Sequence, residues 1–381
     1  MRLPIGFVET GKKERIFIYE KRKTAFIGVD MHKDIHVAVV IDCWTNILGE
    51  ITFPNRPSKF DKFMQDVKKI YKDLTPCFGL EDTRGFGRNF ASYLLGHKFT
   101  VKHVNPAYTD SMRSSAPMSK KNDSFDAFCV AKVLRDMVDT LPDEEHNDLH
   151  WTIRQLVKRR NSLVKGIVIA KNQLNSNLTN VYPSYKKYFC DVDNKTALLF
   201  WEKYPHPQYL KGVKPETLLE ELRTIHKGMK QEQAEMILTL SEQNSPKEKE
   251  FQTERDLIIK SLVREIRFKK QENEDIDNEL KRLVDLTGYK LQTMPGINLI
   301  SAANIISEIG NIERFPNSDK LAQFCGVCPV NFSSAGKGKD QRSRQGNRVL
   351  NAIFHFLAIQ LVQISPSGKP RHPVFREYFE R

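Results

Sequence analysis

The sequence contains no uninterrupted run of 18 apolar residues, and this absence excludes a typical membrane-spanning helix. Residues 1–23 lack the apolar core of a secretory signal peptide, and we expect them to form a basic lead-in. Cysteine is scarce: six residues are scattered along 381, without the close, even spacing of a disulfide framework. Together these absences favour a protein of the reducing cytoplasm with no membrane partner.

Metal ligands at the spacing of a zinc site are also missing. Cys325 and Cys328 form a C-x-x-C, but neither a second pair nor histidines at ligand spacing lie nearby. His32 and His36 are spaced i, i+4, yet they lie beside an expected strand and not in a helix. We therefore expect no zinc site, and we expect both histidines to be surface or packing residues.

Acidic residues are in deficit, with 47 Asp and Glu against 60 Lys and Arg, so the formal net charge is +13. A chain this basic favours a polyanionic partner such as nucleic acid. Its length of 381 residues is enough for a substantial core and for two or three domains.

Short apolar segments and helical patterns alternate along the first third of the chain. Strands are expected over 24–32, 35–43, 47–54, 76–85 and 99–105. Helical spacing is seen over 58–71 and 87–97, that is, before and after the fourth strand. Three consecutive strands followed by alternating strands and helices predict a mixed α/β sheet, in which ligand sites gather at strand ends.

The rest of the chain is mainly helical in pattern. A long helix is expected over 149–180, with a basic stripe that we interpret as a nucleic-acid contact or as a solvated face; the stripe consists of Arg154, Lys158 and Lys165. Residues 246–287 carry spaced apolar positions in a highly charged segment, which indicates a long helix or short coiled coil. This segment is either an arm that contacts a second copy or a helix that bridges two domains.

The last part of the chain contains a polar loop rich in Ser, Gly, Lys and Arg, followed by a buried helix from about Val349. Loops of this composition are often flexible, but this one is bracketed by apolar segments. We therefore expect the loop to be held in place.

Four acidic residues stand where a sheet and a helix could bring them together. Asp30 ends the first expected strand, and Glu81 ends the fourth. If these two strands are neighbours, the two carboxylates meet at one edge of the sheet. Asp123 and Asp126 lie one turn apart at the start of the helix expected over 119–137, which could close over that edge.

The two acids at this helix start have two interpretations. They could complement the helix macrodipole, with Ser119 or Asn122 as the N-cap. Alternatively, all four acids bind metal, because converging carboxylates raise one another's pKa and a divalent cation removes that cost. Mg²⁺ prefers oxygen ligands, and two ions about 4 Å apart can hold both oxygens of a phosphodiester displacement.

Five segments carry a resemblance to a known family. They are "GVDMHKD", "GLEDTRG", "KKNDSFDA", "MPGIN" and "FSSAGK" with the following "RQGNRVL". The chain resembles the DEDD transposases of the insertion-sequence-110 family, which include the Piv/MooV DNA invertases and the bridge-RNA-guided recombinases. The resemblance covers roughly residues 24–165 and 288–365, in the order of the family.

The resemblance implies a three-part architecture after the basic lead-in. Its parts are a RuvC-like catalytic domain of the ribonuclease H type over 24–165, a helical connector with a coiled-coil-like arm over 166–287, and a small, mainly helical transposase domain over 288–381. It also implies that four acids hold Mg²⁺, with two ions possible, and these are Asp30, Glu81, Asp123 and Asp126.

The essential serine of the family falls in the "FSSAG" loop of this chain. We favour Ser334 as the nucleophile and place Ser333 second. Lys337, Arg342 and Arg344 follow in the same loop, and we expect them to stabilise charge on phosphate oxygens.

These observations predict a DNA transposase that cuts and rejoins donor and target DNA strands, using Mg²⁺ and a serine nucleophile. The resemblance further implies a guide RNA from the element itself, a homo-oligomer (dimer or tetramer), and a place at the prokaryotic nucleoid. One alternative is a Holliday-junction-type endonuclease, which hydrolyses with the same acids and needs no serine. Another is a domesticated nucleic-acid-binding protein, in which an acid would be lost; here all four are present.

Overall fold

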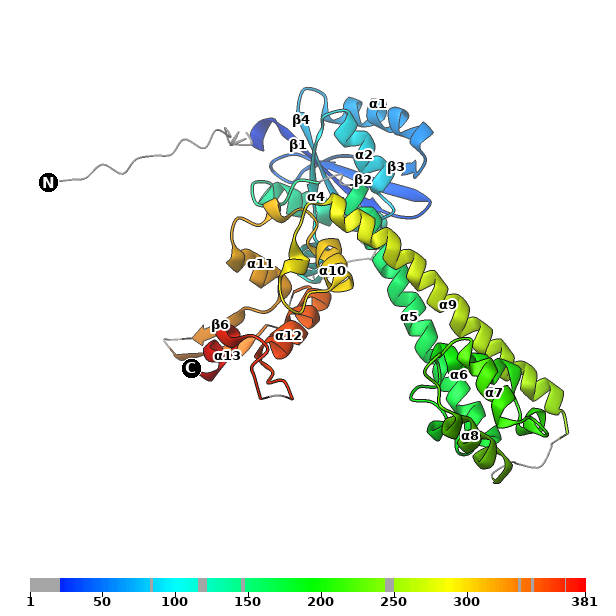
Figure 1. Cartoon of the computed structure of the whole chain (residues 1–381). Helices are drawn as coiled ribbons and strands as arrows, with labels where there is room; N and C mark the ends of the chain where they lie inside the picture. Colours follow the sequence, from blue (N-terminus) through cyan, green and yellow to red (C-terminus); the bar gives the residue numbers. More distant parts are fainter. Residues whose placement is uncertain are drawn as a thin grey trace. The chain divides into compact units, whose positions relative to one another are not determined.

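The structure is a computed structural model, which describes residues 21–82, 85–115, 122–144, 148–243, 250–334, 337–343, 346–366 and 368–381 (Figure 1). The chain divides into two compact units, residues 1–146 and 147–381. None of the described helices combines the length and apolarity needed to cross a lipid bilayer.

A five-stranded mixed sheet forms the centre of the first unit, in the order β3-β2-β1-β4-β5. Its strands are β1 (Thr24–Met31), β2 (Ile35–Ile41), β3 (Ile47–Pro54), β4 (Thr75–Glu81) and β5 (Thr100–His103). The first three strands are antiparallel neighbours, whereas β4 is parallel to β1 and β5 is parallel to β4. The predicted α/β fold of the RuvC-like, ribonuclease H type is confirmed.

Alternate residues of the central strand, β1, are buried on opposite faces of the sheet, because successive side chains of a strand point to opposite sides. Ala25, Ile27 and Val29 of β1 join the core with α1 (Phe60–Tyr71) and α2 (Arg88–Gly96). Phe26 lies in the other core, with α4 (Asp123–Met137). A further helix, α3 (Pro106–Ser114), follows β5 and contacts α4.

A pair of glycines allows α4 to lie directly on the sheet. Gly28 of β1 and Gly79 of β4 are register partners in the parallel pair. A Cβ atom at Gly28 would lie 2.1 Å from the backbone nitrogen of Ala131, and one at Gly79 would lie 3.2 Å from Leu134 Cβ. Larger side chains at these two positions would therefore hold the helix away from the strands.

Two long helices run side by side in the second unit: α5 (Asp148–Val181) and α9 (Gln252–Leu286) (Figure 1). The helix predicted over 149–180 is confirmed, and residue 165, the predicted end of the first domain, lies inside it. Apolar residues of α9 pack against other parts of this chain; they are Ile259, Leu262, Ile266, Leu280 and Leu283. Packing within one chain therefore accounts for the apolar pattern that suggested an arm or dimer contact.

Residues 195–243, part of the predicted helical connector, form a small helical cluster at one end of this helix pair (Figure 1). Its helices are α6 (Lys195–Lys203), α7 (Pro215–Arg223) and α8 (Gln231–Gln243). Trp201 lies at the centre of its core, and its indole N–H donates to the carbonyl of Val192 at 3.1 Å. The core of this cluster is continuous with the helix pair, because residues of α5 and α9 such as Leu178 and Ile266 belong to it.

The C-terminal part consists of helices around a short β-hairpin. Its elements are α10 (Leu299–Ile309), α11 (Ser318–Cys325), β6 (Pro329–Ser334), β7 (Lys337–Arg342), α12 (Arg348–Val362) and α13 (Pro373–Glu380). The expectation of a loop before α12 was wrong, because β6 and β7 pair as antiparallel strands. Backbone hydrogen bonds make such a ribbon without the apolar alternation by which strands are recognised in a sequence.

A candidate acidic metal centre and a serine hairpin

Two of the four predicted acids meet at the end of neighbouring parallel strands. Asp30 has the same parity in β1 as Gly28, so its side chain emerges on the face that α4 covers. Glu81 is the last residue of β4 and the register partner of Asp30. The adjacency of the first and fourth strands, on which this expectation depended, is confirmed.

The other two acids are brought to this edge by the start of α4. The Asn122 side chain caps the helix by accepting a hydrogen bond from the amide of Phe125 at 2.7 Å. Ser119, the other expected cap, lies outside the described residues. Asp126 is buried, whereas Asp123 is exposed, and all four acids line one pocket of about 500 Å³.

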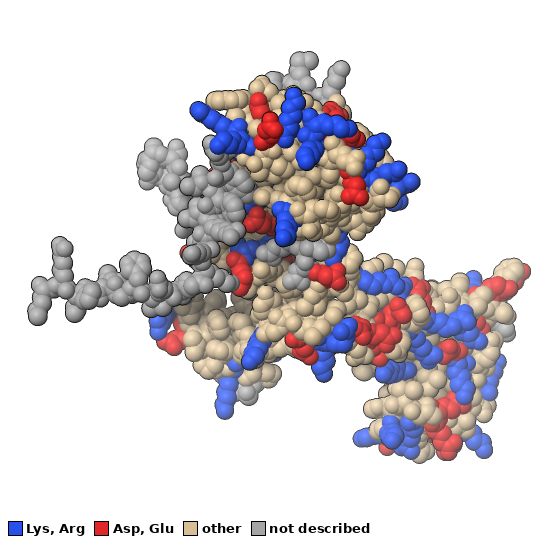
Figure 2. All heavy atoms as spheres, turned by 90° about the horizontal axis from the view of Figure 1, so that it is seen from above, with Lys and Arg blue, Asp and Glu red and all other residues tan. Residues whose placement is uncertain are grey.

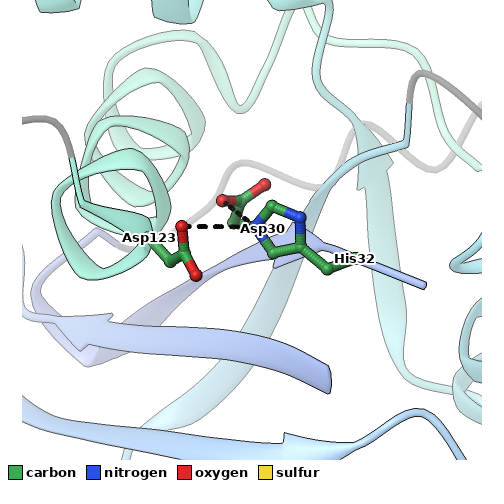
Figure 3. A group of neighbouring side chains, drawn as sticks. All are labelled: Asp30, His32 and Asp123. Carbon is green, nitrogen blue, oxygen red and sulfur yellow. Dashed lines mark ion pairs between the residues drawn. The ribbon is translucent and has the colours of Figure 1, made fainter. Parts of the chain in front are cut away.

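His32 lies between two of the acids (Figure 3). Its Nε2 is 3.0 Å from Asp30 Oδ2 and 3.5 Å from Asp123 Oδ1. Oxygen or nitrogen ligand atoms of these three residues all lie within 4.8 Å of one another, a spacing at which they could share one metal ion. The backbone N–H of His32 donates to Nδ1 of the buried His36 at 3.3 Å, which helps to fix this turn.

Arg113 of α3 occupies the other half of the pocket. Its Nη1 lies 3.0 Å from Asp126 Oδ1, and its Nη2 lies 3.8 Å from Glu81 Oε1 and 2.5 Å from Asp110 Oδ1. The buried hydroxyl of Thr109 donates to Glu81 Oε2 at 2.7 Å. Although burial alone would lower it, hydrogen bonds to Asp110 and Asp126 raise the pKa of Arg113, so this residue is a permanent cation.

The donor set fits a hard divalent cation. Burial raises the pKa of the Asp30 carboxyl above its ordinary value of 3.8; His32 opposes this rise, and the other three acids add to it. Asp30 Oδ2 and Asp126 Oδ1 are both buried; the first lies 3.0 Å from His32 Nε2, and the second lies 3.0 Å from Arg113 Nη1. Buried carboxylate oxygens that converge in this way are suited to coordinate a cation, which would also relieve the repulsion among the acids.

Asp82 directly follows Glu81 in the sequence, but its role is structural. Its two carboxylate oxygens accept hydrogen bonds from the amides of Gly85, Phe86 and Gly87 at 2.7–2.9 Å. Asp82 therefore holds the turn after β4, and Glu81 is the acid that faces the pocket.

Several residues of the pocket were missed in the sequence. His32 was expected on the surface or in packing, and the parity that it shares with Asp30 at the end of β1 was the available signal. His36 does pack, with its ring 5.2 Å from that of Phe53. Arg113 and Thr109 are spaced i, i+4 on a helix that the sequence pattern did not predict, so nothing linked them to the acids.

The favoured serines lie at the end of the C-terminal hairpin. Ser334 is the last residue of β6 and pairs with Lys337, and Ser333 pairs with Gly338. Arg342 is the last residue of β7, whereas Arg344 lies outside the described residues. The side chains of residues 330–340 and 342 are likewise outside the described part, so backbone pairing is what associates Ser334 with Lys337.

The segment after the hairpin is packed closely against α11. Gly346 has φ +112, and a Cβ atom there would lie 2.5 Å from the backbone nitrogen of Gly326. Asn347 caps α12 by accepting from two amides, and its side chain donates to Glu308 Oε2 at 2.5 Å. The "GN" of "RQGNRVL" therefore has a structural task, which is to hold the base of the serine hairpin.

The predicted basic stripe lies along α5, in the second unit. Arg154, Lys158 and Lys165 are all exposed. Arg154 Nη2 lies 3.9 Å from Glu308 Oε2, whereas the two lysines form no ion pair with any other described residue. Figure 2 shows basic and acidic side chains interspersed over the visible face, so the net positive charge is not gathered there into one continuous patch.

Fold and pocket together define a class of protein. A mixed sheet with acids at the ends of its first and fourth strands and at the start of the helix across them is the arrangement that the resemblance to DEDD transposases implied. A family model described as a transposase of the DEDD type of insertion sequence IS110 matches residues 27–183. A second, described as the transposase IS116/IS110/IS902 family, matches residues 288–377.

The chain belongs to the IS110 family of insertion-sequence transposases. It is 21% identical over 346 residues, 87% of this chain and 83% of the relative, to the insertion element IS116 uncharacterized 44.8 kDa protein of Streptomyces clavuligerus. It is 21% identical over 354 residues, 90% of this chain and 80% of the relative, to the transposase for insertion sequence element IS1111A of Coxiella burnetii. With the IS110 protein of Streptomyces coelicolor it shares 23% identity over 270 residues, 70% and 65% of the two chains.

Proposed function

We propose that this transposase cuts and rejoins DNA strands through a serine nucleophile and Mg²⁺ held by Asp30, Glu81, Asp123 and Asp126. The observation that carries the proposal is the convergence of these four acids in one pocket. Two buried oxygens of the set, Asp30 Oδ2 and Asp126 Oδ1, each lie 3.0 Å from a nitrogen of a basic side chain, which supports an environment that favours positive charge. When bound there, Mg²⁺ would polarise the phosphoryl group and stabilise the charge that develops in the transition state.

In the proposed step Ser334 Oγ loses its proton and forms a bond to phosphorus, while the bond from phosphorus to the leaving sugar oxygen breaks. The leaving oxygen takes up a proton and the strand stays attached to the protein as a phosphoserine ester. A hydroxyl end of another strand then attacks the same phosphorus and releases the serine, so the energy of the phosphodiester is retained. Lys337, the backbone partner of Ser334, supplies positive charge beside the anion.

The partners in this proposal are donor and target DNA and a guide RNA transcribed from the element. The charge of +13 supports binding to polyanions. Strand exchange joins two DNA molecules, so we include a dimer or tetramer. Val168 and Ile169, which are 52% and 60% exposed on α5, offer apolar surface for such a contact.

The experiment is a trapping assay with a nicked suicide substrate and Mg²⁺. Wild-type protein is expected to become covalently attached to DNA, and mass spectrometry is expected to map the adduct to Ser334. The variant Ser334→Ala is expected to form no adduct but to keep nucleic-acid binding, and the matched variant Ser333→Ala is expected to react. Asp30→Asn, Glu81→Gln, Asp123→Asn and Asp126→Asn are each expected to abolish adduct formation and strand exchange.

Two outcomes would contradict the proposal. Full activity in excess chelator would eliminate the metal. Cleavage by a Ser333→Ala/Ser334→Ala double variant, with free 5′-phosphate ends and no attached protein, would make water the nucleophile. The protein would then be a metal-dependent, structure-specific endonuclease.

A further inference from the structure

The pocket of the four acids already contains a fixed positive charge, the guanidinium of Arg113. This group lies within 3.0 Å of Asp126 and 3.8 Å of Glu81, and its side chain is only 22% exposed. Arg113 is therefore a counter-ion of two of the proposed metal ligands. A buried cation here limits the repulsion between carboxylates that would otherwise destabilise the fold.

The same position creates a conflict with a divalent cation. Asp126 Oδ1 faces Arg113, and the other oxygen of Glu81, Oε2, is already taken by the hydroxyl of Thr109. A guanidinium and a metal ion held by the same carboxylates would lie within a few ångströms of each other. Two positive charges at that distance in a partly buried site repel strongly.

We propose that Arg113 is a displaceable counter-ion, which leaves Glu81 and Asp126 when a divalent cation binds to the four acids. The inference rests on the proposed metal-binding function. It adds one residue, Arg113, that determines both the affinity for the metal ion and the stability of the protein without the metal. Metal binding then includes the cost of breaking the ion pairs of Arg113.

Asp110 is the partner that binds the guanidinium of Arg113 after it leaves Glu81 and Asp126. It lies three residues before Arg113 on α3, its carboxylate is already 2.5 Å from Nη2, and its side chain is 71% exposed. Arg113 can therefore give up Asp126 and Glu81 and keep one charged partner at the rim of the pocket. No movement of the α3 backbone is needed for this exchange.

If Arg113 instead stays in place and positions the acids, the opposite change in metal affinity is expected. The direction of that change in the Arg113 variant therefore distinguishes the two roles. If Arg113 orients Glu81 and Asp126 while the metal is bound, its loss weakens metal binding. If Arg113 competes with the metal, its loss tightens metal binding and destabilises the metal-free protein, because two buried carboxylates lose their counter-ion.

The test is isothermal titration calorimetry of Mg²⁺, and of Mn²⁺ as a second probe, into the metal-free full chain. Arg113→Gln is expected to bind about tenfold more tightly than wild type, equivalent to about 1.4 kcal/mol. Its metal-free form is expected to unfold at a lower temperature than metal-free wild type. Saturating Mg²⁺ is expected to raise the unfolding temperature of Arg113→Gln by more than it raises that of wild type.

Arg135→Gln is the matched control. Arg135 has a similarly shielded side chain, 21% exposed, and pairs with Asp136 on α4 but does not line the pocket. Its loss is expected to leave metal affinity unchanged.

Asp110→Asn tests whether Asp110 holds the displaced guanidinium, in a protein that still contains Arg113. It is expected to weaken Mg²⁺ binding severalfold in the wild-type background, because the released guanidinium then has no partner. In the Arg113→Gln background it is expected to have no effect.

Weaker or unchanged binding by Arg113→Gln would overturn the inference and leave the metal-binding function in place. Absence of Mg²⁺ and Mn²⁺ binding by wild type and by all variants would contradict both.

Discussion

Asp30 illustrates at the scale of one residue how a strand position determines the properties of a carboxylate. It is the last site-facing residue of a buried strand, and burial together with three nearby acids raises its pKa. A carboxyl whose pKa is higher in the folded than in the unfolded state favours folding at low pH. That contribution is complete below the ordinary value of 3.8 and is lost as the pH rises through the folded-state pKa.

At neutral pH the charged Asp30 therefore lowers the stability of the metal-free protein. We expect Asp30→Asn to raise its unfolding temperature by ~2 °C or more at pH 7, because the amide carries no charge to desolvate. The gain is expected to shrink as the pH falls toward 3.8, where the native carboxyl becomes neutral as well. Scanning calorimetry in chelator over a pH series measures both effects.

Asp73→Asn provides the control for this measurement, because Asp73 is exposed and lies outside the pocket. It is expected to leave the unfolding temperature unchanged. An Asp30→Asn protein that is less stable than wild type at pH 7 would show that the contact with His32 outweighs the cost of burial.

At the scale of elements, the contact of α4 with the sheet decides whether the acids can converge. The helix backbone lies directly on β1 at Gly28, and at Gly79 of β4 the side chain of Leu134 packs onto the strand. Asp126 is carried by the first turn of this helix and directly precedes Ala127, whose carbonyl oxygen is one of the backbone atoms nearest to Gly28. The glycine pair therefore controls the depth at which α4 presents its acids to Asp30 and Glu81.

We expect Gly28→Ala to destabilise the protein by ~3 kcal/mol or more, because the new methyl would meet backbone atoms of α4, which cannot rotate away. Urea unfolding of the metal-free full chain measures the loss. Variants that still fold are expected to bind Mg²⁺ more weakly, since α4 and its two acids are displaced from the strands.

Gly96→Ala is the comparison for this prediction. A Cβ atom at Gly96 meets nothing within 4 Å, and this exposed glycine is the last residue of α2. The substitution is expected to be neutral or slightly stabilising, because alanine has the higher helix propensity. Equal losses in the two variants would mean that the close approach at Gly28 is unimportant.

At the scale of the whole molecule, a transposase of this charge must discriminate its own nucleic acid from the bulk. The excess of 13 positive charges gives affinity for any polyanion, whereas selectivity for the guide RNA that we propose would have to come from structure. Lys158 and Lys165, exposed and without ion pairs among the described residues, are candidates for phosphate contacts on α5.

We expect protein purified from its host to carry one discrete small RNA that matches the flanks of the element. Binding of that RNA is expected to weaken steeply with salt, because counterion release then contributes less. In Lys158→Gln/Lys165→Gln the slope of log affinity against log salt is expected to fall by about 1–2. Filter binding over a salt series measures the slope.

Lys62→Gln/Lys68→Gln removes the same charge from the exposed face of α1 and is expected to leave the slope unchanged. Equal effects of the two double variants would indicate attraction by net charge alone. Copurification of heterogeneous RNA, with no preference for a transcript of the flanks, would contradict guidance.

The sequence by itself determined the mixed sheet, the four acids at strand and helix ends, and the family. These depend on local patterns: β-branched runs make strands, a polar cap begins a helix, and charged residues at the ends of buried strands stand out. It also predicted the long helix over 149–180, now α5. The roles of the acids and of Ser334 remain predictions.

Only the tertiary structure decided which charges balance the acids. Arg113 lies 32 residues after Glu81 and belongs to a helix without a strong apolar pattern, so only folding brings it to the pocket. The polar hairpin of β6 and β7 was hidden for a related reason, because backbone pairing leaves no apolar signature. Local patterns specify elements, but contacts between residues distant in sequence depend on how those elements pack.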